Sequence, residues 1–197
     1  MYTSRTGLIL GFHGTDKSIV DKILDSSTED LEFKVNIYDW LGNGIYFWDN
    51  SPTRAMEWAI ELSKKENPTV KEPAVIGAII DLGYCLDLLD SKNFELLKKG
   101  HTILSTTLTA SGTPMPKNKG RNEDLALREL DCAVIESLHS FLKETGEKQF
   151  DSARGVFWEG NPLYDGAGFK DKNHIQICVK NINCIKGYFR PLDRITN

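Results

Sequence analysis

Long apolar runs, paired cysteines and an excess of positive charge are all missing from this sequence. No apolar run approaches the roughly 20 residues that a membrane-spanning helix needs. Lys plus Arg number 24 against 28 Asp plus Glu, a net charge of −4, which excludes a globally basic nucleic-acid binder but not a local basic patch. The opening residues 1–12 are too short and too polar for a signal peptide, so we expect a soluble, cytoplasmic protein.

The four cysteines, Cys85, Cys132, Cys178 and Cys184, form no C-x-x-C pair and have no histidine at the spacing of a zinc site. Cys178 and Cys184 lie in apolar, strand-like runs, where a reduced cysteine behaves as a small hydrophobe. We therefore predict a reduced protein without a metal ion. The alternative is a catalytic or metal-binding cysteine.

The 197 residues are 40% hydrophobic and 26% charged, typical of a soluble chain that buries one core. The apolar patterns predict strands at 7–12, 45–48, 74–82, 153–158, 174–180 and 184–190. Helices are expected at 15–24, 52–65, 91–99 and 122–144, and an exposed loop at 111–124. Strands at both ends with helices between them predict an α+β fold in a single domain, residues 1–197, with a helical insertion at about 91–150.

A His-Gly-Thr sequence, His13, Gly14 and Thr15, directly follows the first expected strand. An imidazole at such a position can hydrogen-bond a ligand hydroxyl, and Gly14 lets the backbone approach a ligand closely. A histidine of this kind is more often a satisfied structural residue. The motif therefore indicates a ligand site only together with others.

Four aromatic side chains lie in the segment 42–58, which contains the sequence Gly-Asn-Gly-Ile-Tyr-Phe-Trp. Tyr46 and Phe47 point to opposite sheet faces, so we expect one in the core and the other in a cleft. Trp48 and Trp58 are of the kind that stacks on a planar ligand ring. Ordinary core packing is the alternative for any one of these aromatic residues.

Polar side chains alternate with apolar ones in the strand expected at 174–180. His174, Gln176 and Cys178 share one face, and buried polar groups need partners, so this face is predicted to line a pocket. Glu159 ends the strand before it, and Gly160 permits a turn toward the same place. An exposed structural carboxylate is the alternative for Glu159.

The order of these motifs resembles the ADP-ribosyltransferase superfamily, on the side of the poly(ADP-ribose) polymerases and diphtheria toxin, in which a His-Tyr-Glu triad binds NAD. His13 to Thr15 is similar to that family's His-Gly-Ser/Thr, and Tyr46 matches the tyrosine of its Gly-Lys-Gly-Ile-Tyr-Phe. The resemblance implies split antiparallel sheets around an NAD cleft with peripheral helices. It also implies that His13 holds a ribose, that the Gly14 backbone grips the nicotinamide amide and that Tyr46 lies against nicotinamide.

The resemblance continues into the helix expected after the second strand and then departs from the family pattern. Ala55 matches the family's small residue, whereas Arg54 and Glu57 replace a serine and a stacking tyrosine, so Trp58 is expected to stack instead. The family's catalytic glutamate has no counterpart near Asn173. Gln176 keeps hydrogen-bonding capacity without the negative charge, and Glu159 is the candidate to bring a carboxylate from the neighbouring strand.

Our leading hypothesis is a transferase that cleaves NAD and places ADP-ribose on a protein or nucleic-acid target. A bacterial toxin or defence effector fits this hypothesis, and whether an inhibitory partner exists stays open. Gln176, Glu159 and Tyr46 are the candidate catalytic residues. The NAD-binding candidates are His13, Gly14, Thr15, Tyr46, Ala55 and Trp58.

Two other hypotheses remain. A catalytically inactive NAD- or nucleotide-binding interaction module is favoured by the missing motif glutamate. A related transferase that consumes NAD in RNA modification receives slight support from cationic residues in the loop, namely Lys117, Lys119 and Arg121.

Overall fold

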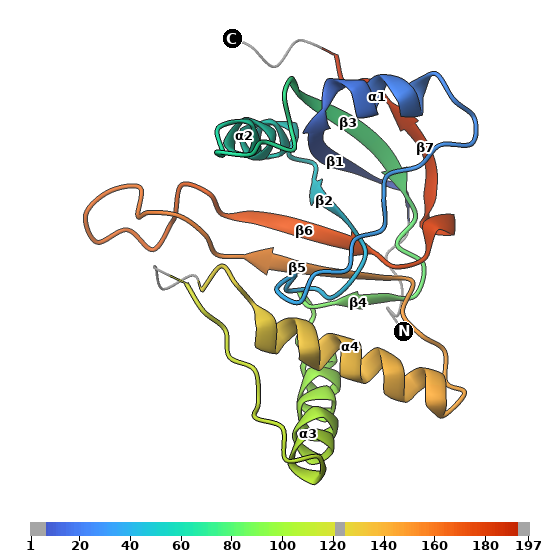
Figure 1. The fold of residues 1–197 in the computed structure, drawn as a ribbon, viewed down its shortest axis with the longest axis vertical. Coiled ribbons are helices and arrows are strands. Elements are labelled where there is room, and N and C mark those ends of the chain that lie inside the picture. The colour runs from blue at the N-terminus through green and yellow to red at the C-terminus, as the bar shows by residue number, and fades with distance from the viewer. Residues whose placement is uncertain (1–6, 121–124, 193–197) are drawn as a thin grey trace.

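A mixed β-sheet lies at the centre of the computed structural model, which describes residues 7–120 and 125–192 (Figure 1). Within those residues the sheet has seven strands in the order β4-β5-β6-β2-β1-β3-β7, and β4 and β5 are its parallel neighbours. The other neighbouring strands pair antiparallel. The strands are β1 (Ile9–Asp16), β2 (Ile45–Asp49), β3 (Pro73–Ile80), β4 (Cys85–Asp87), β5 (Ser152–Phe157), β6 (His174–Val179) and β7 (Ile185–Phe189).

Helices cover both faces of this sheet. The α-helices are α1 (Lys17–Leu24), α2 (Pro52–Ser63), α3 (Phe94–Ala110) and α4 (Glu129–Glu144), and short 3-10 turns lie at Ser91–Asn93 and Ile182–Cys184. α1 packs Val20 against a face that contains the fully buried Phe47. On the other face α4 packs Leu138 against β5 and β6, and α2 packs Ala55 against Trp48. α3 projects from the body of the molecule and contacts α4 (Figure 1).

The pairing of β1 with β2 is much shorter than its pairing with β3. β1 matches β3 over eight residue pairs, from Ile9 to Asp16, whereas its register with β2 consists of Gly11 with Asp49 and Phe12 with Trp48. The two strands therefore diverge in the middle of the sheet, beside the His-Gly-Thr motif. This divergence is the feature of the α+β fold that positions the candidate site.

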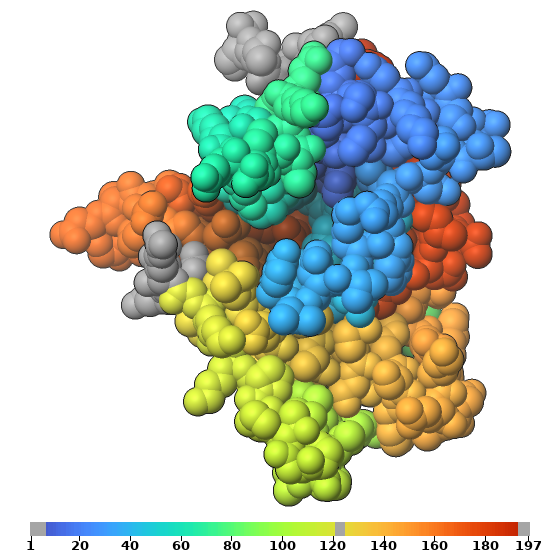
Figure 2. Space-filling view, viewed as in Figure 1, coloured from blue at the N-terminus to red at the C-terminus, as the bar shows by residue number. Residues whose placement is uncertain are grey.

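The segment before β2 crosses the molecule on the outside. In the space-filling view the blue chain that leads to β2 lies between α2 and α4 (Figure 2). Phe33, Val35 and Ile37 in this segment are exposed, and an isolated bridge joins Lys34 to Gly44. The segment thus ends anchored at the glycine turn that precedes Tyr46.

The sequence predicted the α+β class, but the split antiparallel sheets that the resemblance implies were wrong, because the described strands form one mixed sheet. Strand β4 was not predicted, and several element boundaries differ. The first strand does not stop at residue 12, because β1 continues to Asp16 and contains His13, Gly14 and Thr15. The predicted 91–99 helix is a 3-10 turn followed by α3, which extends to Ala110, and the predicted 122–144 helix begins only at Glu129. In residues 7–120 and 125–192 no helix is both long and apolar enough to cross a membrane.

Candidate functional site

The three strands that carry the recognised motifs are neighbours in the sheet, in the order β6-β2-β1. His13 lies on β1, where β1 and β2 diverge, and its Nδ1 is 2.6 Å from the carbonyl oxygen of Tyr46. Because a carbonyl only accepts, Nδ1 donates there and Nε2 of the neutral ring is left as an acceptor. Burial lowers the pKa of His13, so the ring is neutral at pH 7.

Tyr46 and Phe47 do point to opposite faces, as the alternation predicts. Phe47 is fully buried in the core under α1, and Tyr46 packs against the cluster under α4. The Tyr46 hydroxyl donates to the Gly42 carbonyl at 2.7 Å and accepts from the Leu41 amide at 2.9 Å. Burial raises the pKa of Tyr46 well above its ordinary value, so this hydroxyl stays protonated and holds the glycine turn.

Gly14 is required by helix packing. A Cβ atom at this position would lie 1.9 Å from the carbonyl oxygen of Ala55, so the backbone of α2 crosses directly over β1 here. Ala55 on α2 is itself fully buried, and Thr15, which follows Gly14 on β1, is also buried. The motif glycine and the small residue of α2 thus meet each other, and α2 covers this face of Gly14.

Five rings follow one another along the sheet face under α2. Trp58 on α2 lies 6.2 Å from Trp48, and Trp48 lies 6.0 Å from His174. His174 is 5.5 Å from Phe157, which is 5.1 Å from Trp40. Trp58 is the half-exposed end of this row, with 36% of its surface accessible, so it is the ring available to stack on a ligand.

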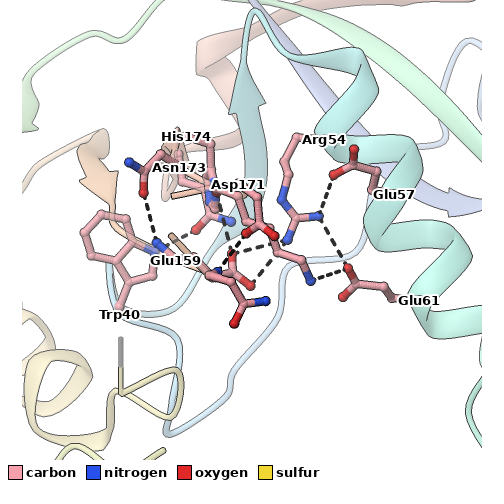
Figure 3. Close-up of polar contacts among 11 residues, drawn as sticks. Trp40, Arg54, Glu57, Glu61, Glu159, Asp171, Asn173 and His174 are labelled. Atoms are coloured by element: carbon pink, nitrogen blue, oxygen red, sulfur yellow. Dashed lines mark hydrogen bonds and ion pairs between the residues drawn. The ribbon is translucent and has the colours of Figure 1, made fainter. Parts of the chain in front are cut away.

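Glu159 reaches the place where the resemblance expects an acid. It follows β5, and its Oε2 lies 3.8 Å from Nδ1 of His174 and 3.2 Å from Nη2 of Arg54 (Figure 3). The side chain of Glu159 is 18% exposed, and burial raises its pKa, although Arg54 opposes that shift. The neighbouring strand therefore does bring a carboxylate to the start of β6.

His174 is neutral beside this carboxylate. Its Nδ1 is 2.6 Å from the Lys172 carbonyl oxygen and donates to it, which leaves Nε2 as an acceptor. Burial lowers the pKa of His174 to about 4. Gln176, the next residue on the same face, accepts a hydrogen bond from Trp40 Nε1 at 2.6 Å. The side-chain carbonyl oxygen of Gln176 is thus already engaged in this structure.

Arg54 organises the charges around the site (Figure 3). Its side chain is only 6% exposed, and it lies 3.4 Å from Glu57 and 3.8 Å from Glu61 in addition to its contact with Glu159. Lys172 pairs with Glu61 at 2.7 Å. In the motif resemblance Arg54 was noted only because it replaces a serine of the family. No pattern in the sequence predicted that Arg54 would contact three carboxylates.

Buried polar atoms without a hydrogen-bond partner gather at the same place. Four such side-chain atoms occur among the described residues, and three of them are Trp48 Nε1, Arg54 Nε and His174 Nε2. Two are donors and the third, given the tautomer of His174, is an acceptor. Buried polar groups in folded proteins nearly always have partners, so this cluster fits a site that a polar ligand completes.

Other predicted features lie elsewhere or give no further support. Lys119 pairs with Glu129 at 2.9 Å, which offsets part of the cationic loop, and Arg121 lies outside the described residues. Across the described ranges no group of three or more His, Cys, Asp or Glu side chains is arranged to hold a metal ion. The cysteines there are free thiols.

Comparison with known protein families, with characterised proteins and with solved structures found no match to this chain. The arguments that follow therefore rest on the geometry of the site and on the motif resemblance.

Proposed function

We propose that this protein is an ADP-ribosyltransferase that cleaves NAD and transfers ADP-ribose to a macromolecule. The observation that carries the proposal is the position of Glu159. Its partly buried carboxylate lies 3.8 Å from His174, at the start of the strand where the resemblance expects the catalytic acid. The order β6-β2-β1 supports the same proposal, since it places the strands that carry His174, Tyr46 and His13 side by side, with the ring of His13 against Phe47 on the face under α1.

In the proposed reaction the bond between the nicotinamide nitrogen and the ribose carbon breaks, and its electron pair leaves with nicotinamide. Positive charge then grows on the ribose, and an acceptor oxygen or nitrogen attacks the same carbon and releases its proton to the solvent. A carboxylate in a water-poor site stabilises that charge more than it stabilises the ground state. We assign this role to Glu159, ribose binding to Nε2 of His13, and stacking to Trp58.

A catalytically inactive nucleotide-binding module is the second candidate, and one contact favours it. Both carboxylate oxygens of Glu159 accept from Nη2 of Arg54, at 3.3 and 3.2 Å, so part of the negative charge is already neutralised. In the active protein, NAD binding has to leave that carboxylate facing the ribose.

Purified protein incubated with NAD labelled in its adenosine portion, together with a whole-cell lysate, separates these candidates. Label that becomes attached to macromolecules, and is then released by protease or by nuclease, supports the transferase and identifies the acceptor class. Binding of NAD without attached label or released nicotinamide supports the inactive module. Absence of NAD binding at millimolar concentration rejects the transferase and any module that binds NAD.

A further inference from the structure

A polar hollow lies at the end of β6 opposite the candidate site described above. Its volume is about 470 Å³, within the range of small-molecule sites, and it is lined by the C-terminal half of α4, by the residues just before β5 and by the residues that follow β6. His174 opens β6 and Lys180 directly follows its end, and six residues of extended chain span roughly 20 Å.

An ion pair forms one wall of the hollow. The Lys180 ammonium is 2.9 Å from Glu136 Oε1 and donates to the Asn43 carbonyl at 3.0 Å. The Asn43 amide donates in turn to the same oxygen of Glu136 at 2.8 Å. Although burial alone raises the pKa of Glu136, Lys180 brings it below the ordinary value, so the pair is charged at pH 7.

The hollow is lined by two carboxylates, Glu136 and Asp151, and by two ammonium groups, Lys143 and Lys180, which carry its available N–H groups. An ammonium has three N–H groups and Lys180 uses two of them, so one is available. Lys143, in the last turn of α4, has no carboxylate partner within ion-pair distance among the described residues. The carboxylate of Asp151, by contrast, accepts from the Tyr84 amide at 2.9 Å and from Asn181 at 2.8 Å.

The fourth buried polar atom without a partner belongs to this hollow. It is Nε2 of His139, a residue that lines the hollow, and burial lowers the pKa of this ring to about 4. Phe33 lies at the rim with 47% of its surface exposed, so an aromatic face is available beside the lysines. An orphaned imidazole, two lysines and an aromatic rim favour a ligand that is anionic at one end and planar at the other.

We propose that this hollow binds a small phosphate monoester of mononucleotide size, with its phosphate on Lys143 and Lys180 and its ring against Phe33. Such a ligand would contact the ion pair that holds Asn43, and the adjacent Gly42 carbonyl accepts from the Tyr46 hydroxyl. The site stands apart from the proposed NAD site, and its existence does not depend on catalysis.

Calorimetric titration of the full chain with AMP tests the proposal. We expect saturable binding at sub-millimolar concentration, weakened at least about tenfold by Lys143→Glu. Ser140→Trp, which places an indole in the hollow from the surface of α4, should abolish it. Lys98→Glu, the same charge reversal at an exposed position of α3 outside both sites, is the matched control and should change the affinity less than about twofold. Both α4 positions are on or near the helix surface, and an unchanged Tm shows that the variants fold.

The same titrations identify the contrary results. AMP binding that survives Lys143→Glu and Ser140→Trp but is lost in His13→Ala would place the nucleotide between β1 and β2 and overturn the proposal. No heat up to 10 mM AMP would overturn it as well. Inorganic phosphate that binds with the same variant dependence supports the phosphate subsite and identifies free phosphate as a sufficient ligand.

Discussion

Glu159, just after β5, forms an ion pair with Arg54 in the first turn of α2. Oε2 of Glu159 lies 3.2 Å from Nη2 of Arg54. Their side chains are 18% and 6% exposed. A charge this buried needs its partner, because removal of one member leaves the other desolvated without compensation. The contact therefore links the fold of α2 to the chemistry proposed for Glu159.

Removal of Arg54 should destabilise the protein strongly. Arg54→Met leaves Glu159 buried without its cation, and we expect the free energy of unfolding to fall by about 3 kcal/mol. Urea denaturation followed by circular dichroism measures the change. Arg190→Met is the control, because Arg190 forms an exposed ion pair with Asp21 and should cost less than about 1 kcal/mol. Equal losses in the two variants would mean that the buried cluster contributes no more than a surface pair.

NAD should raise the thermal midpoint, and His13→Ala should diminish that effect. A ligand at about 100 times its Kd stabilises the folded state by roughly 2.7 kcal/mol. The ring of His13 is fixed by its bond to the Tyr46 carbonyl and leaves Nε2 available for a ribose hydroxyl. Differential scanning fluorimetry across NAD concentrations checks this, and the absence of any shift at millimolar NAD argues against an NAD site.

Tyr46→Ala and Phe47→Ala should separate activity from stability. Phe47 is fully buried in the core, so its truncation is expected to cost about 3–5 kcal/mol of stability. Tyr46 holds the turn at Gly42 through its hydroxyl, and at equal folded fraction its truncation should reduce activity far more. The reverse outcome would mean that the catalytic face of β2 is the one under α1.

Stability should fall as the pH is lowered from 6.5 toward 4. The pKa values of His139 and His174 are about 4 in the folded protein against an ordinary value near 6.5, so over this window the unfolded chain binds protons that the folded chain does not. Each histidine should remove about 2 kcal/mol between pH 7 and pH 5. Urea midpoints measured against pH test this for His139→Leu. A slope as steep as that of the wild type would contradict the assignment to His139.

Alternation along single strands was the most reliable guide that the sequence offered. It placed Tyr46 and Phe47 on opposite faces of β2, and it placed His174, Gln176 and Cys178 on one face of β6, because adjacent residues of any strand point to opposite faces. The end of β1 was missed because strand ends depend on the partner. Pairing with β3 carries the extended backbone through Gly14 to Asp16, although the local sequence reads as a turn.

The ion pairs of the candidate site could not be predicted from local sequence patterns. Arg54 and Glu159 are 105 residues apart in the sequence and meet only through the packing of α2 beside the β5–β6 connection. The same holds for Trp40 and Gln176, which are 136 residues apart. Glu159 was predicted as a candidate from its place at the end of a strand, whereas its cationic partner follows from tertiary structure alone.

The last prediction concerns the carboxylate itself. If the protein transfers ADP-ribose, Glu159→Gln should reduce turnover at least about 100-fold, equivalent to about 2.7 kcal/mol of activation free energy, with little change in NAD affinity. The amide keeps the hydrogen bonds to Arg54 in part but cannot stabilise positive charge on the ribose. Single-turnover release of nicotinamide, compared with NAD affinity from calorimetry, provides the measurement.

Glu57→Gln is the matched control for that experiment. Glu57 also contacts Arg54, at 3.4 Å, but its side chain is 49% exposed on α2, so its loss should leave turnover nearly unchanged. A comparable defect in both variants would assign the effect to the positioning of Arg54. If Glu159→Gln retains full activity, Gln176→Glu decides the location of the centre: increased NAD cleavage would show that this position on β6 faces the reacting ribose. Full activity in Glu159→Gln together with an unaffected Gln176→Ala would move the catalytic centre away from this end of β6, since no other described carboxylate lies within ion-pair distance of His174.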